Sequence, residues 1–127
     1  MPRPDPRELA AIFAGGCVGA LARAGLERAF GADPGAWPWT TLLINVAGAF
    51  ALGVFATRLQ ERLPPSPYRR PLLGTGFCGA LTTFSTLQLE LLDLLDADRY
   101  GAAAAYLGVS VLFGYLGVQV ATGLVRR

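Results

Sequence analysis

The chain has 127 residues, of which 53% are hydrophobic and 16% are charged, and its mean hydropathy is +0.43. Soluble domains ordinarily contain about 25% charged residues, so this composition excludes an ordinary soluble domain and indicates a small membrane protein. The net charge of +2 comes from 11 basic residues, all arginine, against 9 acidic residues. The arginines lie near the ends of apolar segments and not along one face, which argues against a nucleic-acid partner.

The titratable and thiol side chains do not suggest an enzyme. The sequence contains no histidine, which removes the usual general base and the commonest zinc ligand. Cys17 and Cys78 both lie within apolar segments, and we interpret them as small buried packing residues, not as a disulfide. No residue set for covalent catalysis is visible, so no enzymatic activity is expected.

Four apolar segments are long enough to cross a bilayer, which takes roughly 20 residues of helix. They cover about residues 9–28, 40–59, 71–95 and 100–125, and predict a single four-helix transmembrane domain over residues 1–127. The first segment resembles a signal peptide, but Arg23 continues its helical pattern and three further spans follow, so we interpret it as a membrane helix. The expected fold class is therefore an all-α membrane protein.

The arginines predict an orientation for this domain. With four spans, both termini and the middle loop share one side of the membrane. That side contains eight arginines, namely Arg3, Arg7, Arg58, Arg62, Arg69, Arg70, Arg126 and Arg127, whereas the other side contains Arg28 and Arg99. Because arginine-rich loops remain in the cytoplasm, both termini are expected to be cytoplasmic.

The third segment combines glycines and hydroxyls near its centre, over residues 74–86. Glycine is unfavourable in a helix by about 1 kcal/mol, and Ser and Thr offer the backbone competing hydrogen bonds, so a helix break at mid-membrane is one interpretation. Such irregular backbone requires burial in protein or a wet cavity, and broken helices often present carbonyls to cations. The alternative is that the glycines only allow close helix packing.

Polar residues also mark faces of the other segments. Thr41, Asn45 and Gly48 share a face in the second segment, while Tyr106 and Ser110 recur on one face of the fourth. These faces suggest a path lined by polar side chains, although a single mid-span amide often only forms a hydrogen bond between helices. In the first segment, Arg23 is followed one turn later by Glu27, so snorkelling or pairing with Glu27 competes with ligand contact as its role.

The sequence resembles a known family, the Fluc/CrcB fluoride channels. The resemblance covers essentially the whole chain in length, span number and motif order. It is carried by Gly16-x-x-Gly19-Ala20-x-x-Arg23 in the first segment, by Asn45 in the second, and most specifically by Gly76-Phe77-Cys78-Gly79-Ala80-Leu81-Thr82-Thr83-Phe84-Ser85-Thr86 in the third.

The resemblance implies a fluoride-selective channel in a prokaryotic plasma membrane, which lowers cytoplasmic fluoride by passive efflux. It implies four transmembrane helices with the third broken at mid-membrane, and an antiparallel dimer of the dual-topology type, formed with a second copy or with a homologous chain. A structural sodium ion at the dimer centre would be bound by the carbonyls of Gly79 and Thr82, a suitable oxygen set for a hard cation. The anion pore would be lined by Asn45, Phe84, Ser110, Tyr106, Thr83 and Thr86, with Arg23 and Glu90 in structural or vestibule positions.

Two positions depart from the family pattern. Leu87 stands where a second phenylalanine is usual one turn after Phe84, and Gly114 replaces a serine one turn after Ser110. Leucine has no ring edge to offer an anion, so a pore built around Leu87 is expected to conduct poorly or not at all. Neither change affects the implied sodium ligands.

Two rival functions lack the residues that they need. A small four-helix proton-coupled multidrug exporter needs a titratable acid deep in its first span, but Glu8 and Glu27 only flank that span. A membrane lipid kinase needs several carboxylates near the interface. The acidic connector at residues 93–98 could supply them, but it is interpreted as a solvated loop.

Overall fold

The computed structural model of the protein describes residues 3–127, and every regular element within that range is a helix. These elements are α1 (Pro6–Phe30), α2 (Trp39–Glu61), the π-helix η1 (Pro71–Cys78), α3 (Gly79–Leu81), α4 (Phe84–Asp96) and α5 (Tyr100–Arg126). Helices α1, α2 and α5 cover the first, second and fourth expected segments. Among the described residues, these three helices are long and apolar enough to cross a membrane.

The third expected segment, residues 71–95, is not a single continuous helix. It begins as η1, continues as the single turn α3, and becomes extended at Thr82 (φ −77°, ψ 153°) and Thr83 (φ −146°, ψ 122°). α4 then starts at Phe84. Neither part reaches the length of a membrane-spanning helix, so three of the four expected spans are continuous helices and the third is interrupted.

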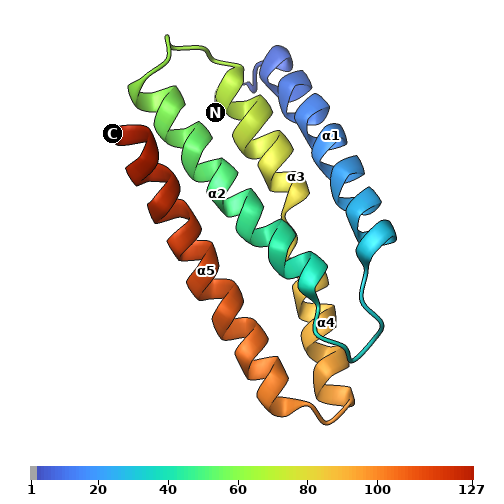
Figure 1. Ribbon diagram of the computed structural model, residues 1–127. Helices are drawn as coiled ribbons and strands as arrows, with labels where there is room; N and C mark the ends of the chain where they lie inside the picture. Colours follow the sequence, from blue (N-terminus) through green and yellow to red (C-terminus); the bar gives the residue numbers. More distant parts are fainter. Residues whose placement is uncertain (1–2) are drawn as a thin grey trace.

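The helices lie side by side in the order α5, α2, η1–α3 and α1, with α4 continuing the interrupted segment towards the loop before α5 (Figure 1). The C-terminus, the start of α1 and the loop between α2 and η1 lie at one end of the molecule. The loop between α1 and α2 and the loop between α4 and α5 lie at the other end. The interruption at Thr82 and Thr83 falls between these two ends.

α1 packs against η1 and α3 through glycines, which bring the two backbones into direct contact. A Cβ atom added at Gly15 would overlap the carbonyl oxygen of Leu72, and one added at Gly76 would lie 2.5 Å from the carbonyl oxygen of Ile12. Gly15 and Gly19 are the buried residues of α1. This is the close approach that small residues allow between membrane helices, so glycine packing and the interruption occur together in this segment.

α2, α4 and α5 share the hydrophobic core. Its buried side chains cluster around Tyr106, which is completely inaccessible, and comprise Leu42, Leu87, Leu94, Ala103 and Tyr106. Leu87 lies in this core, with 7% of its surface exposed. The residue that departs from the family pattern on α4 is therefore a packing residue in the described chain.

Candidate functional site: a polar row beside the helix interruption

The side chain of Asn45 on α2 holds the extended backbone at the interruption. Its Nδ2 donates to the carbonyl oxygen of Thr83 at 3.1 Å, and its Oδ1 accepts from the amide nitrogen of Thr83 at 2.8 Å. A residue in extended conformation between two helices leaves both groups without helical partners. The two bonds satisfy them, and one of the two Nδ2 hydrogens of Asn45 is left for a further acceptor.

Arg23 reaches the same interruption from α1. Its Nε donates to the carbonyl oxygen of Ala80 at 3.1 Å, and a terminal guanidinium nitrogen lies 3.6 Å from Oε1 of Glu27. A cation near the last carbonyls of a helix interacts favourably with its dipole. Arg23 therefore caps the end of α3 and pairs with Glu27, so the sequence-based hypothesis of pairing with Glu27 agrees with the structure.

Two carbonyl groups beside the interruption remain without hydrogen bonds. Within residues 3–127, no donor bonds the carbonyl oxygens of Gly79 or Thr82, whereas that of Cys78 accepts from both the amide nitrogen and the hydroxyl of Thr82. Gly79 is also exposed in the single chain. Backbone carbonyls without donors suit a hard cation, so these residues fit the sodium site that the resemblance implies.

Hydroxyl groups continue the polar surface from the interruption into α4. Oγ1 of Thr83 accepts from the amide nitrogen of Thr86 at 3.2 Å, which caps the first turn of α4. The same oxygen lies 3.2 Å from Oγ1 of Thr86 and 3.3 Å from Oγ of Ser85. Thr83 is therefore both the N-cap of α4 and the centre of a hydroxyl cluster.

Glu90, one turn further along α4, joins three helices. Its Oε1 accepts from the hydroxyl of Thr41 on α2 at 2.6 Å, and its Oε2 accepts from the hydroxyl of Tyr106 on α5 at 2.7 Å. Both partners are buried, with 1% and 0% of their surfaces exposed. The ring of Trp37 packs edge-on against Tyr106, with 5.7 Å between the centroids. This arrangement fixes the Glu90 carboxyl inside the helix group.

A small pocket connects this polar row with the end of the molecule that contains the α1–α2 loop. It measures about 210 Å³ and is lined by residues of the loop, such as Asp33 and Pro38, and by Thr86, Glu90 and Asp93 of α4. Thr83 is the N-cap of α4, and Thr86 and Glu90 follow it three and seven residues later, so the three residues lie along one side of the helix between the interruption and this pocket.

Two further predicted pore residues lie outside this hydrogen-bonded row. Oγ of Ser110 is inaccessible to solvent and has no hydrogen-bond partner among the described residues. Phe84 is 71% exposed at the first position of α4. Its ring therefore belongs to the surface of the single chain and not to its core.

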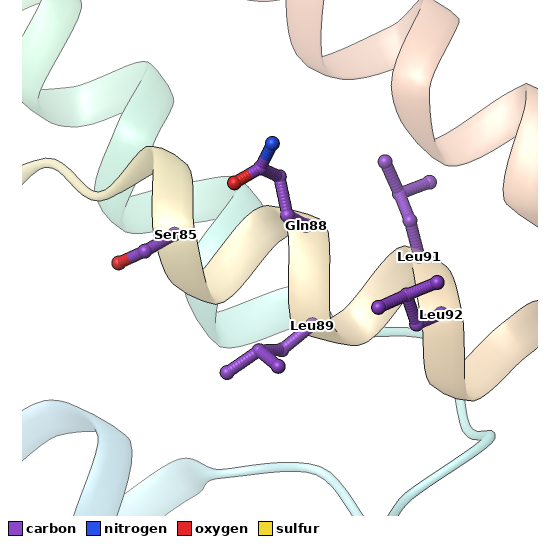
Figure 2. Close-up of a pocket in the computed structure, with 5 residues that line it drawn as sticks. All are labelled: Ser85, Gln88, Leu89, Leu91 and Leu92. Atoms are coloured by element: carbon purple, nitrogen blue, oxygen red, sulfur yellow. The ribbon is translucent and has the colours of Figure 1, made fainter.

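The outward side of α4 carries polar groups on an apolar surface. Figure 2 shows Ser85, Gln88, Leu89, Leu91 and Leu92 around an open depression, all of them contributed by α4. Gln88 is exposed, and its amide points away from α4. An exposed amide in a membrane helix is unfavourable against lipid alone, which makes this side of α4 a candidate contact surface.

Comparison with known proteins identifies the family. The sequence model of the family described as "CrcB-like protein, Camphor Resistance (CrcB)" matches residues 10–123. The chain belongs to the CrcB family. Among its relatives, Fluoride-specific ion channel FluC 1 of Mycobacterium bovis is 59% identical over 127 residues, covering 100% of this chain and 96% of the relative. FluC 2 of Nocardia farcinica is 39% identical over 126 residues, covering 99% and 90%, respectively.

The CrcB motif residues are thus partly brought together by the fold. Asn45, Thr83 and Thr86 are linked by hydrogen bonds, and Glu90 is bonded to Tyr106. Sequence analysis did not include Thr41 among the site residues, although it lies one turn before Asn45 on the same face of α2. The one-turn spacing between Thr41 and Asn45 could have indicated Thr41 from the sequence. In the structure, Thr41 is buried and donates to Glu90.

Proposed function

We propose that this chain is a subunit of a fluoride-selective channel in a prokaryotic plasma membrane, and that it lowers cytoplasmic fluoride by passive efflux. The named relatives are fluoride-specific ion channels. The observation that carries the proposal is the group of polar side chains at the helix interruption, where Asn45, Thr83 and Thr86 are linked by hydrogen bonds and Asn45 retains a second Nδ2 hydrogen. No covalent chemistry is needed for this activity.

Fluoride would exchange its hydration shell for donors of the protein near the interruption, since both oxygens of Glu90 act as acceptors. A small anion is costly to bury without hydrogen bonds, so each donor near the interruption matters. Asn45 has a second Nδ2 hydrogen beyond the one given to Thr83, and Ser110 has a hydroxyl without a partner. Phe84 would add its electropositive ring edge, and the hydroxyls of Thr83 and Thr86 would complete the pore, whereas the hydroxyl of Tyr106 donates to Glu90.

The unpaired carbonyls of Gly79 and Thr82 would hold a sodium ion at the centre of a dimer. When bound, this ion would supply a fixed positive charge and join the two chains. A twofold axis through the interruption would bring two carbonyls from each chain together, and such an isologous contact is the commonest dimer symmetry. Gly79 of α3 and Ser85 and Gln88 of α4 are exposed in the single chain, which supports a partner beside the interrupted segment.

The partner would run antiparallel, as either a second copy or a homologous chain. A homodimer of this kind needs one sequence that inserts both ways. The end of the molecule that contains both termini has eight arginines against two at the other end, which favours a single orientation with cytoplasmic termini. A homologous chain with the opposite arginine bias would resolve this conflict. Equal cytoplasmic and periplasmic signals from C-terminal reporter fusions would argue for the homodimer.

The test of the function is fluoride efflux from liposomes that contain the purified chain, alone and with a candidate partner chain, measured with a fluoride electrode. Fluoride is expected to leave while chloride is retained. Efflux only in the presence of the partner would assign the active form to the heterodimer. Equal efflux of fluoride and chloride, or no efflux from any of these preparations, would refute the proposal.

The alternative of a proton-coupled multidrug exporter has no support in these relatives, which are named as fluoride channels. The acidic residues of α1 also lie at its two ends. Glu8 is in the first turn, and Glu27 is paired with Arg23. An exporter of this kind would need such an acid in the middle of the helix, exposed to a substrate path.

A further inference from the structure

Gly48 lies one turn after Asn45 on α2 and contacts the residue next to the one that Asn45 holds. It is buried, and a Cβ atom added there would overlap Cγ2 of Thr82. The added atom would also lie 3.7 Å from Cβ of Thr82 and 3.9 Å from Cδ2 of Leu81. The methyl group of Thr82 therefore occupies the space that the missing side chain of Gly48 leaves on α2.

Thr82 cannot easily turn this methyl group elsewhere. Its hydroxyl donates to the carbonyl oxygen of Cys78 at 3.0 Å, and a β-branched side chain has few favourable χ1 rotamers. Rotation about χ1 would move the methyl group away from Gly48 only by breaking that bond. The position of the methyl group and the position of the Thr82 backbone are thus coupled.

The contact at Gly48 differs from the glycine contacts of α1. Gly15, Gly19 and Gly76 face backbone atoms of a neighbouring helical segment, so they determine how closely two helices approach. Gly48 instead faces the side chain of an extended residue whose carbonyl oxygen accepts no hydrogen bond within residues 3–127. Because no group in this range donates to the Thr82 carbonyl, its direction depends on the position of the Thr82 residue.

We propose that Gly48 is a positioning residue that sets the direction of the Thr82 carbonyl by seating the Thr82 methyl group on α2. Together with Asn45, it holds two consecutive extended residues from two positions one turn apart on the same helix. The inference rests on the proposed function, in which this carbonyl is a cation ligand. An alanine at position 48 would displace Thr82 and misdirect the carbonyl, although it leaves every hydrogen-bonding group in place.

The test exchanges one methyl group between the two positions. Gly48→Ala adds a methyl where Thr82 has one, Thr82→Ser removes the Thr82 methyl but keeps the hydroxyl, and the double variant contains one methyl in the same space. Gly25→Ala is the control, because a Cβ atom there meets no atom within 4 Å. Two quantities are measured for each protein: fluoride efflux from liposomes, and the rise in Tm when sodium chloride replaces choline chloride.

Gly48→Ala is expected to lower fluoride efflux about tenfold or more and to reduce the sodium-dependent rise in Tm. Displacements near 1 Å at a functional site have effects on rate of about this size. Thr82→Ser should lower both quantities less. The double variant should recover to within about twofold of the unmodified chain, because contacting positions are non-additive. A merely structural role would lower Tm equally in both salts and leave the sodium-dependent rise unchanged.

Unmodified efflux from Gly48→Ala, or a double variant no better than Gly48→Ala, would overturn the inference. If Gly48→Ala does not fold, the comparison of Thr82→Ser with the double variant decides, since the added alanine must then raise both quantities. If the unmodified chain passes no fluoride, the proposed function fails, but the sodium-dependent Tm values still test the role of Gly48. An unmodified chain whose Tm ignores sodium would also overturn the inference.

Discussion

The two parts of the interrupted segment are held by different kinds of contact. η1 and α3 pack against α1 through glycines, backbone against backbone, and within residues 3–127 the one side-chain hydrogen bond between them is from Arg23 to Ala80. α4 is instead joined to α2 and α5 by the buried bonds of Glu90 and by the side chains around Tyr106. Shape complementarity dominates the first contact, and hydrogen bonding dominates the second.

The η1–α3 part is therefore a rigid support, whereas the α4 part presents polar groups that an ion could contact. Backbone contacts between glycines permit almost no adjustment, because neither helix has a side chain that can move aside. The α4 side contains groups that can exchange partners, such as the hydroxyls of Thr83 and Thr86 and the second Nδ2 hydrogen of Asn45. A path for an ion needs such groups on one side and a rigid support on the other.

The largest expected effect is on the rigid support. Gly15→Ala would place a Cβ atom on the carbonyl oxygen of Leu72, so α1 and η1 would have to separate. We expect a loss of about 3 kcal/mol in the free energy of unfolding, the upper part of the usual range for overpacking. Gly25→Ala is the control on the same helix, because its Cβ atom meets nothing within 4 Å. Equal stability of the two variants in detergent unfolding would contradict the close contact.

A smaller effect is expected where α4 meets α5. Tyr106→Phe removes the hydroxyl that donates to Glu90 at 2.7 Å but keeps the packed ring. The expected loss is about 1.5 kcal/mol in the free energy of unfolding, as for a bond to a carboxyl group. Tyr115→Phe, at a 62% exposed position of the same helix, should change it little. If both variants unfold alike, the Glu90 bond contributes nothing to stability.

The smallest effect is expected at the start of α4. Thr83→Ala removes the N-cap oxygen that accepts from the amide nitrogen of Thr86, which should cost about 1 kcal/mol in the free energy of unfolding. Ser85→Ala removes a neighbouring exposed hydroxyl of the same cluster and should cost less than about 0.5 kcal/mol. A larger loss for Ser85→Ala than for Thr83→Ala would show that the capping interaction is not the stabilising one.

The sequence predicts the helical segments well where the length of an apolar run is enough to indicate a helix. Length and composition alone are enough to identify three long apolar helices, which end near Phe30, Glu61 and Arg126. The π-helical form of η1 could not be predicted, since eight residues leave no periodicity that distinguishes it from an α-helix. Local residue types cannot report such a tertiary effect.

The candidate site was predicted as a set of residues but not as an arrangement. Asn45 was expected to serve an anion, and its two bonds to the Thr83 backbone depend on where the interruption lies relative to α2. Leu87 was interpreted as a position in the pore, and in the single chain its side chain is buried beside Tyr106, another predicted pore residue. Both outcomes depend on the rotation of one helix relative to another, which no single segment encodes.

The central claim is that fluoride passes beside Asn45 at the interruption, and fluoride efflux from liposomes with Asn45→Asp tests it most directly. The aspartate keeps an acceptor for the amide nitrogen of Thr83, but it loses the donor and places a negative charge on the path. We predict a fall to about one hundredth of the unmodified rate or below, as for the loss of one essential anion donor. Gln60→Glu, which makes the same change in the last turn of α2 beside the loop, should conduct normally. Unmodified efflux from Asn45→Asp would contradict the claim and leave Asn45 as a contact between helices.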